Sequence, residues 1–275
     1  REPAVVRGLP LGACGNGWSV ERLRRAQCSA PAVSVHVCAS ETVDLAGHRP
    51  PNTPRNFVFR SMPFAEAVMR CSGTMGDDAP EDGHAGSLEP LLAPGERYYL
   101  RSVGLDPRKH TADFPTLFPD LAAECTLVPT AKPTRAAGGA AGGEGEGRLL
   151  DPAAYHSSVL RLASDDTQLW THFDVMDNML AQLTGRKRVV MWAPEEDDNL
   201  YVEGSSSPPH HPVLTCPLSL VTRGRYVEGS SSRVADIDSW NDDEFPRFRR
   251  AVPRRLETEL TPGDVLFIPA LWFHN

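Results

Sequence analysis

The sequence contains no long hydrophobic run. Its longest apolar stretch covers about nine residues, from Val265 to Phe273, whereas roughly 20 are needed to cross a bilayer as a helix. No segment of these 275 residues is therefore predicted to span a membrane. Residue 1 is an arginine, so we expect the natural start to lie upstream, where a signal or transit peptide would not be visible.

Positive charge is also scarce. The chain has 28 Lys and Arg against 36 Asp and Glu, which gives a formal net charge of −8. A hydrophobic content of 40% with 23% charged residues is typical of a soluble globular protein with a sizeable core. The negative balance argues against a general nucleic-acid binder but leaves a local basic patch open.

Paired cysteines and two common catalytic motifs are missing as well. The six cysteines occur without any CxxC pair, at positions 14, 28, 38, 71, 125 and 216. A disulfide framework or a structural zinc site is therefore not predicted, and reduced thiols favour a cytoplasmic or nuclear location. The chain also lacks a Gly-rich phosphate loop ending in Lys-Ser/Thr and a nucleophile elbow.

The remaining pattern indicates one domain over residues 1–275 with two inserts. Residues 131–147, "AKPTRAAGGAAGGEGEG", are too rich in glycine to pack, so a flexible insert is expected there. The word "YVEGSSS" occurs at 201–207 and again at 226–232. A local duplication or an error in the gene structure explains it, and we expect a duplicated, disordered insert over residues 201–225.

Short strands with tight turns dominate the predicted secondary structure. Ser19 is expected to cap a short helix, "SVERLRRA", and "AVSVHVC" alternates as a half-buried strand with its valines on one face. The segments "NFVFRSM" and "RYYLRSVG" are further strand candidates. In "DNMLAQLTGRKRVVMWAP", two apolar runs are joined by Thr184-Gly185, which predicts a hairpin or tight turn. A buried strand over Val265 to Ile268 then ends at Pro269. This spacing favours a β-sandwich or barrel.

A candidate metal site lies in "LWTHFDVMDN". On a strand, residues i and i+2 point the same way, so His172 and Asp174 can aim at one ion. His274, at the end of "ALWFHN", is the candidate third ligand. Two histidines and one carboxylate form the facial triad of non-haem Fe(II) oxygenases. The alternative is a satisfied core histidine beside an aspartate that caps a turn.

Four other residues are weaker candidates. Asp177 is a rival carboxylate, but on a regular strand it should face away from His172. His210 and His211 lie in the duplicated insert. His36 is on the polar face of its strand and is expected to be a surface residue.

The segments around these candidates resemble those of a known group of enzymes. "LWTHFDVMDNMLAQLTGRKRVVMWAP" followed by "GDVLFIPALWFH" resembles the Jumonji-C group of 2-oxoglutarate oxygenases. Within that group the chain is most similar to the tRNA wybutosine hydroxylases. The matching words "REPAVVRGLPLGAC", "NFVFRSMPF", "YYLRSVGLDPRK" and "HFDVMDNML" span most of the chain outside the inserts. The resemblance implies a mainly β fold with flanking helices around a double-stranded β-helix, the cupin-like jelly roll.

The resemblance also implies a ligand set. His172, Asp174 and His274 match iron ligands, and Tyr99, Asn178 and Lys187 match residues that hold 2-oxoglutarate. We expect Lys187 on a strand beside the His172 strand, where a cation could meet the far carboxylate of the co-substrate. For an isolated residue the alternatives are a core tyrosine, a turn asparagine and a solvated lysine.

The implied reaction uses Fe(II), 2-oxoglutarate and O2 to hydroxylate an unactivated C–H bond. The implied substrate is the wybutosine precursor in phenylalanine tRNA. A Jumonji-C protein hydroxylase or histone-lysine demethylase shares the same motifs, and a non-catalytic metal-binding scaffold is the third hypothesis.

A basic run is the candidate tRNA contact. "RFRRAVPRR" at 247–255 carries arginines that can pair with phosphates; these are Arg247, Arg249, Arg250, Arg254 and Arg255. The alternative is a solvated charged face.

The chain ends one residue after His274. A closed double-stranded β-helix normally needs further strands beyond the distal histidine, so we expect the jelly roll to be truncated at this end. The resemblance also places C-terminal helices and a homodimer contact beyond Asn275, and dimerisation is not expected of these residues alone.

Overall fold

The computed structural model describes most of the chain, in two compact units. It describes residues 1–39, 41–43, 56–73, 95–106, 110–127, 155–203 and 231–275. The first unit comprises Arg1–Arg7, Glu41–Asn56 and Gln168–Asn275, and the second comprises Gly8–Ser40 and Phe57–Thr167. The predicted insert at 131–147 and most of that at 201–225 lie outside the described residues.

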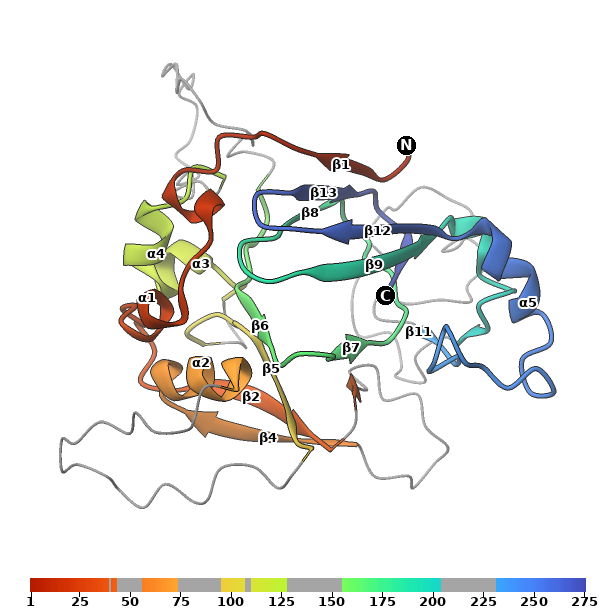
Figure 1. Cartoon of the computed structure of the whole chain (residues 1–275), viewed down its shortest axis with the longest axis horizontal. Helices are drawn as coiled ribbons and strands as arrows, with labels where there is room; N and C mark the ends of the chain where they lie inside the picture. Colours follow the sequence, from red (N-terminus) through yellow and green to blue (C-terminus); the bar gives the residue numbers. More distant parts are fainter. Residues whose placement is uncertain (40, 44–55, 74–94, 107–109, 128–154, 204–230) are drawn as a thin grey trace. The chain divides into compact units, whose positions relative to one another are not determined.

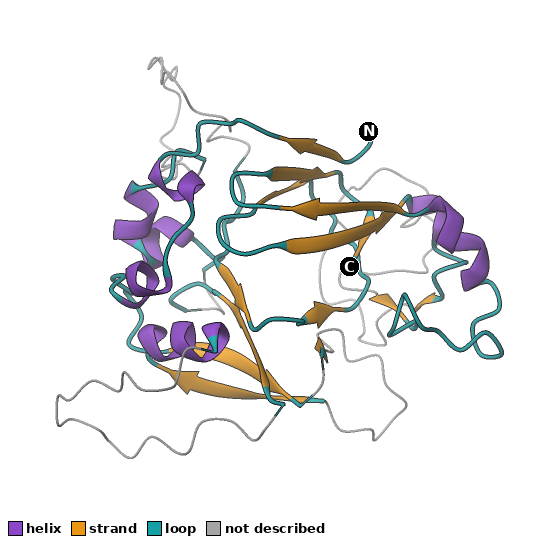
Figure 2. Cartoon of the chain, in the orientation of Figure 1, coloured by secondary structure: helices purple, strands orange, loops and turns teal. Residues whose placement is uncertain are grey.

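Two three-stranded antiparallel sheets form the centre of the first unit (Figures 1 and 2). One has the order β1-β13-β8, made of Ala4–Val6, Val265–Ile268 and Asn178–Ala181. The other has the order β12-β9-β14, made of Leu256–Leu260, Lys187–Trp192 and Phe273–His274.

Short pieces of strand extend this unit. His172 forms isolated bridges to both His274 and Ser231, and so links β14 to the small sheet of β10 (Val202–Glu203) and β11 (Ser231–Ser232). β3 (Thr42–Val43) runs parallel to β7 (Gln168–Leu169). Three short helical segments complete the unit: η2 (Pro194–Glu196), α5 (Phe248–Ala251) and η3 (Val252–Arg254).

The register places two apolar clusters on opposite faces of β9. One cluster joins Val189 and Met191 to Leu180, Leu266 and Ile268 of the other three-stranded sheet, so the two sheets pack against each other there. The alternate residues Val190 and Trp192 face a second cluster that includes Phe173, Phe248 and Phe273. Two packed antiparallel sheets with few helices fit the predicted β-rich jelly roll.

The turn at Thr184-Gly185 connects the two sheets and does not form a hairpin, so that half of the prediction is wrong. Gly185 has φ +72°, a conformation that favours glycine. β8 pairs with β13, and β9 pairs with β12 and β14. The chain therefore turns a corner between layers at Gly185, as a jelly roll requires.

The turn before β13 is held by Asp264. Its Oδ2 accepts hydrogen bonds from the backbone N–H and the hydroxyl of Thr261, both at 2.9 Å. Its Oδ1 accepts one from the Nε of Arg7 at 3.0 Å. The hydrogen bond from the Thr261 backbone, with the Arg7 charge adding to it, lowers the pKa of the Asp264 carboxyl.

The second unit contains a four-stranded antiparallel sheet of order β4-β2-β5-β6 with helices packed on it. The strands are β2 (Val33–Cys38), β4 (Phe57–Met62), β5 (Arg97–Arg101) and β6 (Arg161–Ala163). The helices are η1 (Ala13–Asn16), α1 (Val20–Arg24), α2 (Phe64–Ser72), α3 (Phe114–Leu117) and α4 (Pro119–Ala123).

Local sequence signals predicted this unit well, with one correction. The Ser19 hydroxyl caps α1 by accepting from the Arg22 backbone N–H at 3.0 Å, and Val33, Val35 and Val37 are all buried. His36, however, is half-buried and not a plain surface residue. Aromatic rings on the neighbouring strands β4 and β5 enclose it.

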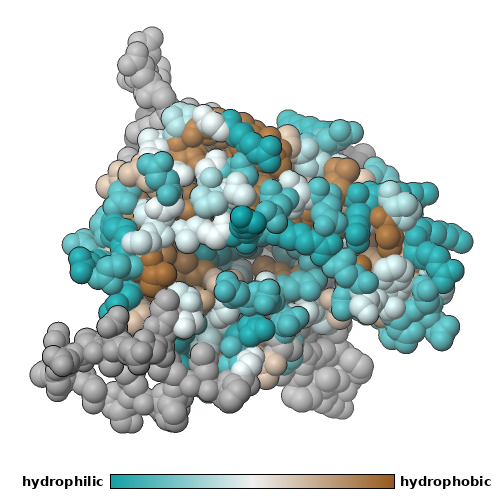
Figure 3. Space-filling view, viewed as in Figure 1, coloured by the Kyte–Doolittle hydropathy of each residue, from teal (hydrophilic) through white to brown (hydrophobic). Residues whose placement is uncertain are grey.

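Hydrophilic side chains cover most of the face shown in Figure 3, with smaller hydrophobic areas between them. In the parts of the chain that the structure describes, no helix is long and apolar enough to cross a membrane.

Candidate metal centre

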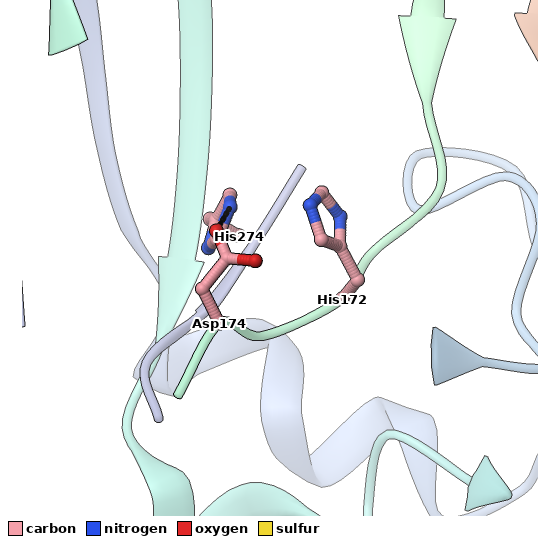
Figure 4. A group of neighbouring side chains, drawn as sticks. All are labelled: His172, Asp174 and His274. Carbon is pink, nitrogen blue, oxygen red and sulfur yellow. Dashed lines mark ion pairs between the residues drawn. The ribbon is translucent and has the colours of Figure 1, made fainter. Parts of the chain in front are cut away.

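Three side chains of the first unit converge as the sequence predicts. One nitrogen each from His172 and His274 and one oxygen from Asp174 all lie within 4.8 Å of one another. Figure 4 shows the Asp174 carboxylate directed between the two imidazole rings. Among the described residues, this is the one group of three or more such side chains that could hold a metal ion.

Backbone pairing brings the two histidines together. The His172 N–H donates to the His274 carbonyl at 3.1 Å, and the His274 N–H donates to the His172 carbonyl at 2.8 Å. Residues paired in this way in an antiparallel ladder project their side chains on the same face. The ring centroids are accordingly 4.4 Å apart.

The tautomer of each ring follows from a second hydrogen bond. The Nδ1 of His172 lies 2.8 Å from the Trp170 carbonyl, and the Nδ1 of His274 lies 3.0 Å from the Trp272 carbonyl. A carbonyl only accepts, so Nδ1 carries the proton in both rings and Nε2 keeps its lone pair. Such outer contacts typically orient metal-ligating histidines.

Asp174 is positioned without a regular strand. Between Thr171 and Asp177, only His172 forms strand bridges, and Asp174 lies in an irregular part of the chain before a bend. The prediction that an extended strand carries both residues is corrected accordingly. The Asp174 carbonyl accepts from the Leu271 N–H at 2.8 Å. Leu271 is buried and has φ +71°, a conformation that is strained for a branched residue and is often found near functional sites.

Asn178, at the start of β8, contacts the carboxylate directly. Its Nδ2 donates to the Asp174 Oδ2 at 2.6 Å, while that same oxygen lies 3.7 Å from the His274 Nε2. This bond holds the Asp174 carboxylate in place beside His274. The prediction that Asn178 holds 2-oxoglutarate stays a prediction, and the contact adds an orienting role that no sequence pattern indicated.

Lys187 faces the same interior as the cluster, but its strand is not beside the His172 segment as predicted. Lys187 lies opposite Leu260, which is fully buried between the sheets. It shares a face of β9 with Met191, which pairs with His274. Four residues along a strand span about 13 Å. β14 lies between β9 and His172. Lys187 is therefore separated from the metal ligands by β14 and by most of the length of β9, although it lies on the same inner face of the sheet.

Tyr99 belongs to the second unit, on β5. Its side chain is 2% exposed, and its hydroxyl is buried with no hydrogen-bond partner in the described part of the chain. Buried hydroxyls normally have partners, so this atom is suited to a ligand. Its role as a 2-oxoglutarate contact remains a prediction.

Asp177, the rival carboxylate, uses both of its oxygens in hydrogen bonds to other segments of the chain. Its Oδ1 accepts from the Ala270 N–H at 2.8 Å and its Oδ2 from Arg1 at 2.7 Å. Both oxygens therefore tie the loop before β14 and the N-terminal segment together. His210 and His211 lie outside the described residues.

The five arginines predicted to contact tRNA are mostly neutralised. Arg249 pairs with Asp242 at 2.6 Å, Arg254 with Glu196 at 2.8 Å, and Arg255 with Asp238 at 3.3 Å. Arg247 stacks on Tyr201 with its Cζ 4.5 Å from the ring centroid, and Arg250 is exposed. Arg188 also binds Asp238 and lowers the pKa of that carboxyl. The charge pairing favours the solvated-face alternative, and tRNA contact by this run stays a prediction.

Comparison with known proteins places this geometry in a family. The model of the Cupin-like domain matches residues 1–275. The chain is 35% identical over 275 residues to tRNA wybutosine-synthesizing protein 5 of Mus musculus, covering 100% of the chain and 67% of that protein. The proteins of the same name from Danio rerio and Homo sapiens are 37% and 34% identical over 275 residues, and the full chain covers 64% and 67% of them. The chain thus spans about two thirds of the length of these relatives.

Proposed function

Because the chain belongs to the Cupin-like domain family, we propose that it is an Fe(II)- and 2-oxoglutarate-dependent oxygenase that hydroxylates the wybutosine precursor in phenylalanine tRNA. The observation that carries the proposal is the convergence of His172, Asp174 and His274. The relatives named for wybutosine synthesis support the substrate.

The donor set fits a divalent iron ion. Two neutral imidazole Nε2 atoms and one carboxylate oxygen on one side of an ion leave adjacent coordination positions open, which is typical of non-haem Fe(II) oxygenases. The Asp174 side chain is 38% exposed and that of His274 is 13% exposed, so the open side is accessible. When bound, iron would supply the activation of O2 coupled to decarboxylation of 2-oxoglutarate, which the side chains of the site cannot provide.

The chain's own residues would hold the ligands in place. The Trp170 and Trp272 carbonyls keep both rings in the Nδ1–H form, and Asn178 orients the Asp174 carboxylate through its Oδ2. We assign Lys187 to the distal carboxylate of 2-oxoglutarate, since its ammonium group, on the inner face of β9, can form a charge-assisted hydrogen bond with a carboxylate. The buried apolar residues of β9, β13 and β14 would keep water from the reacting centre.

The test is a single-turnover product assay. The protein is incubated with Fe(II), 2-oxoglutarate and phenylalanine tRNA from cells that lack the hydroxylase, and the modified nucleoside is weighed by mass spectrometry. We expect a gain of one oxygen with matching succinate. The Asp174→Ala variant is the control, because it removes a ligand and should give neither product.

Two other outcomes would reject the proposal in different ways. Turnover on a peptide without any change in tRNA would support a Jumonji-C protein hydroxylase or demethylase. Tight metal binding without succinate release would leave only a non-catalytic scaffold.

A further inference from the structure

The four-stranded sheet of the second unit is covered by helices on one face. The valines of β2 point to that face, as does Tyr98 of β5, whose hydroxyl accepts from Arg70 of α2 at 3.1 Å. Alternate residues along a strand point the other way. The opposite surface therefore carries Ser34 and His36 of β2 with their cross-strand partners on β4, β5 and β6. Its centre is buried at Phe57 and Tyr99, and its margins are exposed, so we call it the open face after those margins.

An aromatic row crosses the open face. His36 pairs with Phe59 on one side and with Tyr99 on the other. The His36 ring centroid is 4.5 Å from that of Phe59 and 5.6 Å from that of Tyr99. Phe59 is 56% exposed, although Phe57 packs edge-on against it. An exposed phenylalanine held in place by two neighbouring rings offers a rigid flat surface to a partner.

A polar and basic row lies next to it. Ser34 pairs with Ser61, and Arg101 of β5 stands directly opposite Arg161 of β6. All four residues are exposed. Like charges directly opposite each other on a sheet are destabilising, so this arrangement is unfavourable unless an anion lies between the two guanidinium groups.

Among the described residues, several arginines of the unit have carboxylate partners, whereas Arg101 and Arg161 have none. Arg70 pairs with Glu66 at 2.6 Å and Arg60 with Glu96 at 3.8 Å. Arg101 and Arg161 are strand partners of each other, and in the part of the chain that the structure describes neither forms an ion pair. The two guanidinium groups are therefore available to a phosphate.

We propose that the open face binds the RNA substrate, with Phe59 stacking on a base and the Arg101–Arg161 pair holding a phosphate. Phe59 lies two strands and two residues along the sheet from Arg101, roughly 12 Å between Cα atoms. The stacked base and the bound phosphate would therefore belong to different nucleotides of one strand. Four-stranded antiparallel sheets that expose aromatics on the face without helices are one of the recurring RNA-binding surfaces.

The inference rests on the proposed function for its choice of RNA. Arg101 is two residues from Tyr99 on the same face, about 7 Å along β5. An acidic protein segment would need the charge but not the exposed ring, and it is one outcome of the test below.

The experiment measures binding of phenylalanine tRNA by fluorescence anisotropy over a range of salt concentrations, without iron or 2-oxoglutarate. We expect the Arg101→Ala/Arg161→Ala variant to bind roughly tenfold more weakly. Its plot of log affinity against log salt should be shallower by about 0.7, since the variant loses one phosphate contact and each such contact on a single strand contributes about 0.7. Phe59→Ala should weaken binding roughly 5- to 150-fold with an unchanged slope, and Phe59→Tyr should restore it.

The matched control is Arg24→Ala/Arg25→Ala, which also removes two arginines from this unit, one half-buried and one exposed. Both are paired with Glu21 on α1, at 3.2 and 2.6 Å, so we expect little change. Circular dichroism of every variant checks folding. The proposal is wrong if the Arg101/Arg161 variant binds like the wild type. It is also wrong if Phe59→Ala has no effect and polyglutamate displaces the RNA. Wild-type protein that binds no tRNA would instead reject the proposed function itself.

Discussion

Removing the amide of Asn178 should weaken metal binding before it affects the co-substrate. The Asn178→Ala variant loses the 2.6 Å hydrogen bond to the Asp174 Oδ2, the oxygen that lies 3.7 Å from the His274 Nε2. Hydrogen bonds to charged groups contribute about 1.5–3 kcal/mol. Loss of contacts that orient a metal ligand typically lowers metal affinity about 10- to 100-fold.

The assay is anaerobic titration calorimetry with Fe(II), and with Co(II) as a stable substitute, in the absence of 2-oxoglutarate. We expect the dissociation constant for both ions to rise by one to two orders of magnitude. Asn199→Ala is the matched control, because Asn199 makes the same kind of bond, 2.8 Å to Glu196, away from the cluster. Its metal affinity should equal that of the wild type.

One result would refute the orienting role. If Asn178→Ala binds metal as tightly as the wild type, while its KM for 2-oxoglutarate rises, then Asn178 acts only on the co-substrate. Asn178→Ser keeps a short donor and should fall between the two. A melting curve of each variant without metal separates a local effect from general unfolding.

Three further predictions concern the ligand set, the duplication and the turn before β13. For Asp174→Ala we expect a melting temperature like that of the metal-free wild type and no rise when metal is added, since only a native site gains stability from its ligand; a metal-induced rise would contradict the ligand assignment. Deleting residues 204–228 leaves Gly-Ser between β10 and β11, a two-residue hairpin loop with glycine first, so the shortened chain should fold and bind metal normally; insoluble protein would speak against it. Because hydrogen bonds lower the pKa of Asp264, its stabilising effect should be present above the unfolded value near pH 4 and be lost as pH falls through the lower folded value, so urea titrations of wild type and Asp264→Ala should differ at pH 7 and converge in acid.

The sequence predicted those features of the fold that depend on neighbouring residues. The Ser19 cap and the buried valines of β2 depend on residues a few positions apart, and a local sequence pattern can therefore predict them. The three metal ligands could be predicted because the sequence segments around them resemble those of a family. That resemblance connects His172 to His274 even though the two residues are far apart in the chain. Local geometry did not place them, since Asp174 lies outside any strand and is positioned by Leu271 and Asn178.

Pairing between distant strands could not be predicted in the same way. The Thr184-Gly185 turn is compatible with a hairpin or with a corner between sheets, and the partners β12 and β13 that decide the outcome lie more than 60 residues further on. His36 was misplaced for a related reason. Its strand pattern assigns it to the polar face correctly, but the rings that enclose it come from β4 and β5.

The connection between β10 and β11 has a practical consequence. Twenty-seven residues, 204–230, separate Glu203 from Ser231, yet the Val202–Ser232 pairing and the bridge from Ser231 to His172 are in place. Because the β10–β11 pairing forms despite so long a connection, this connection is a suitable site for inserting an additional segment. A fluorophore-binding tag inserted there would be attached one strand away from a metal ligand, and its emission could report metal loading at a wavelength well separated from that of the five tryptophans.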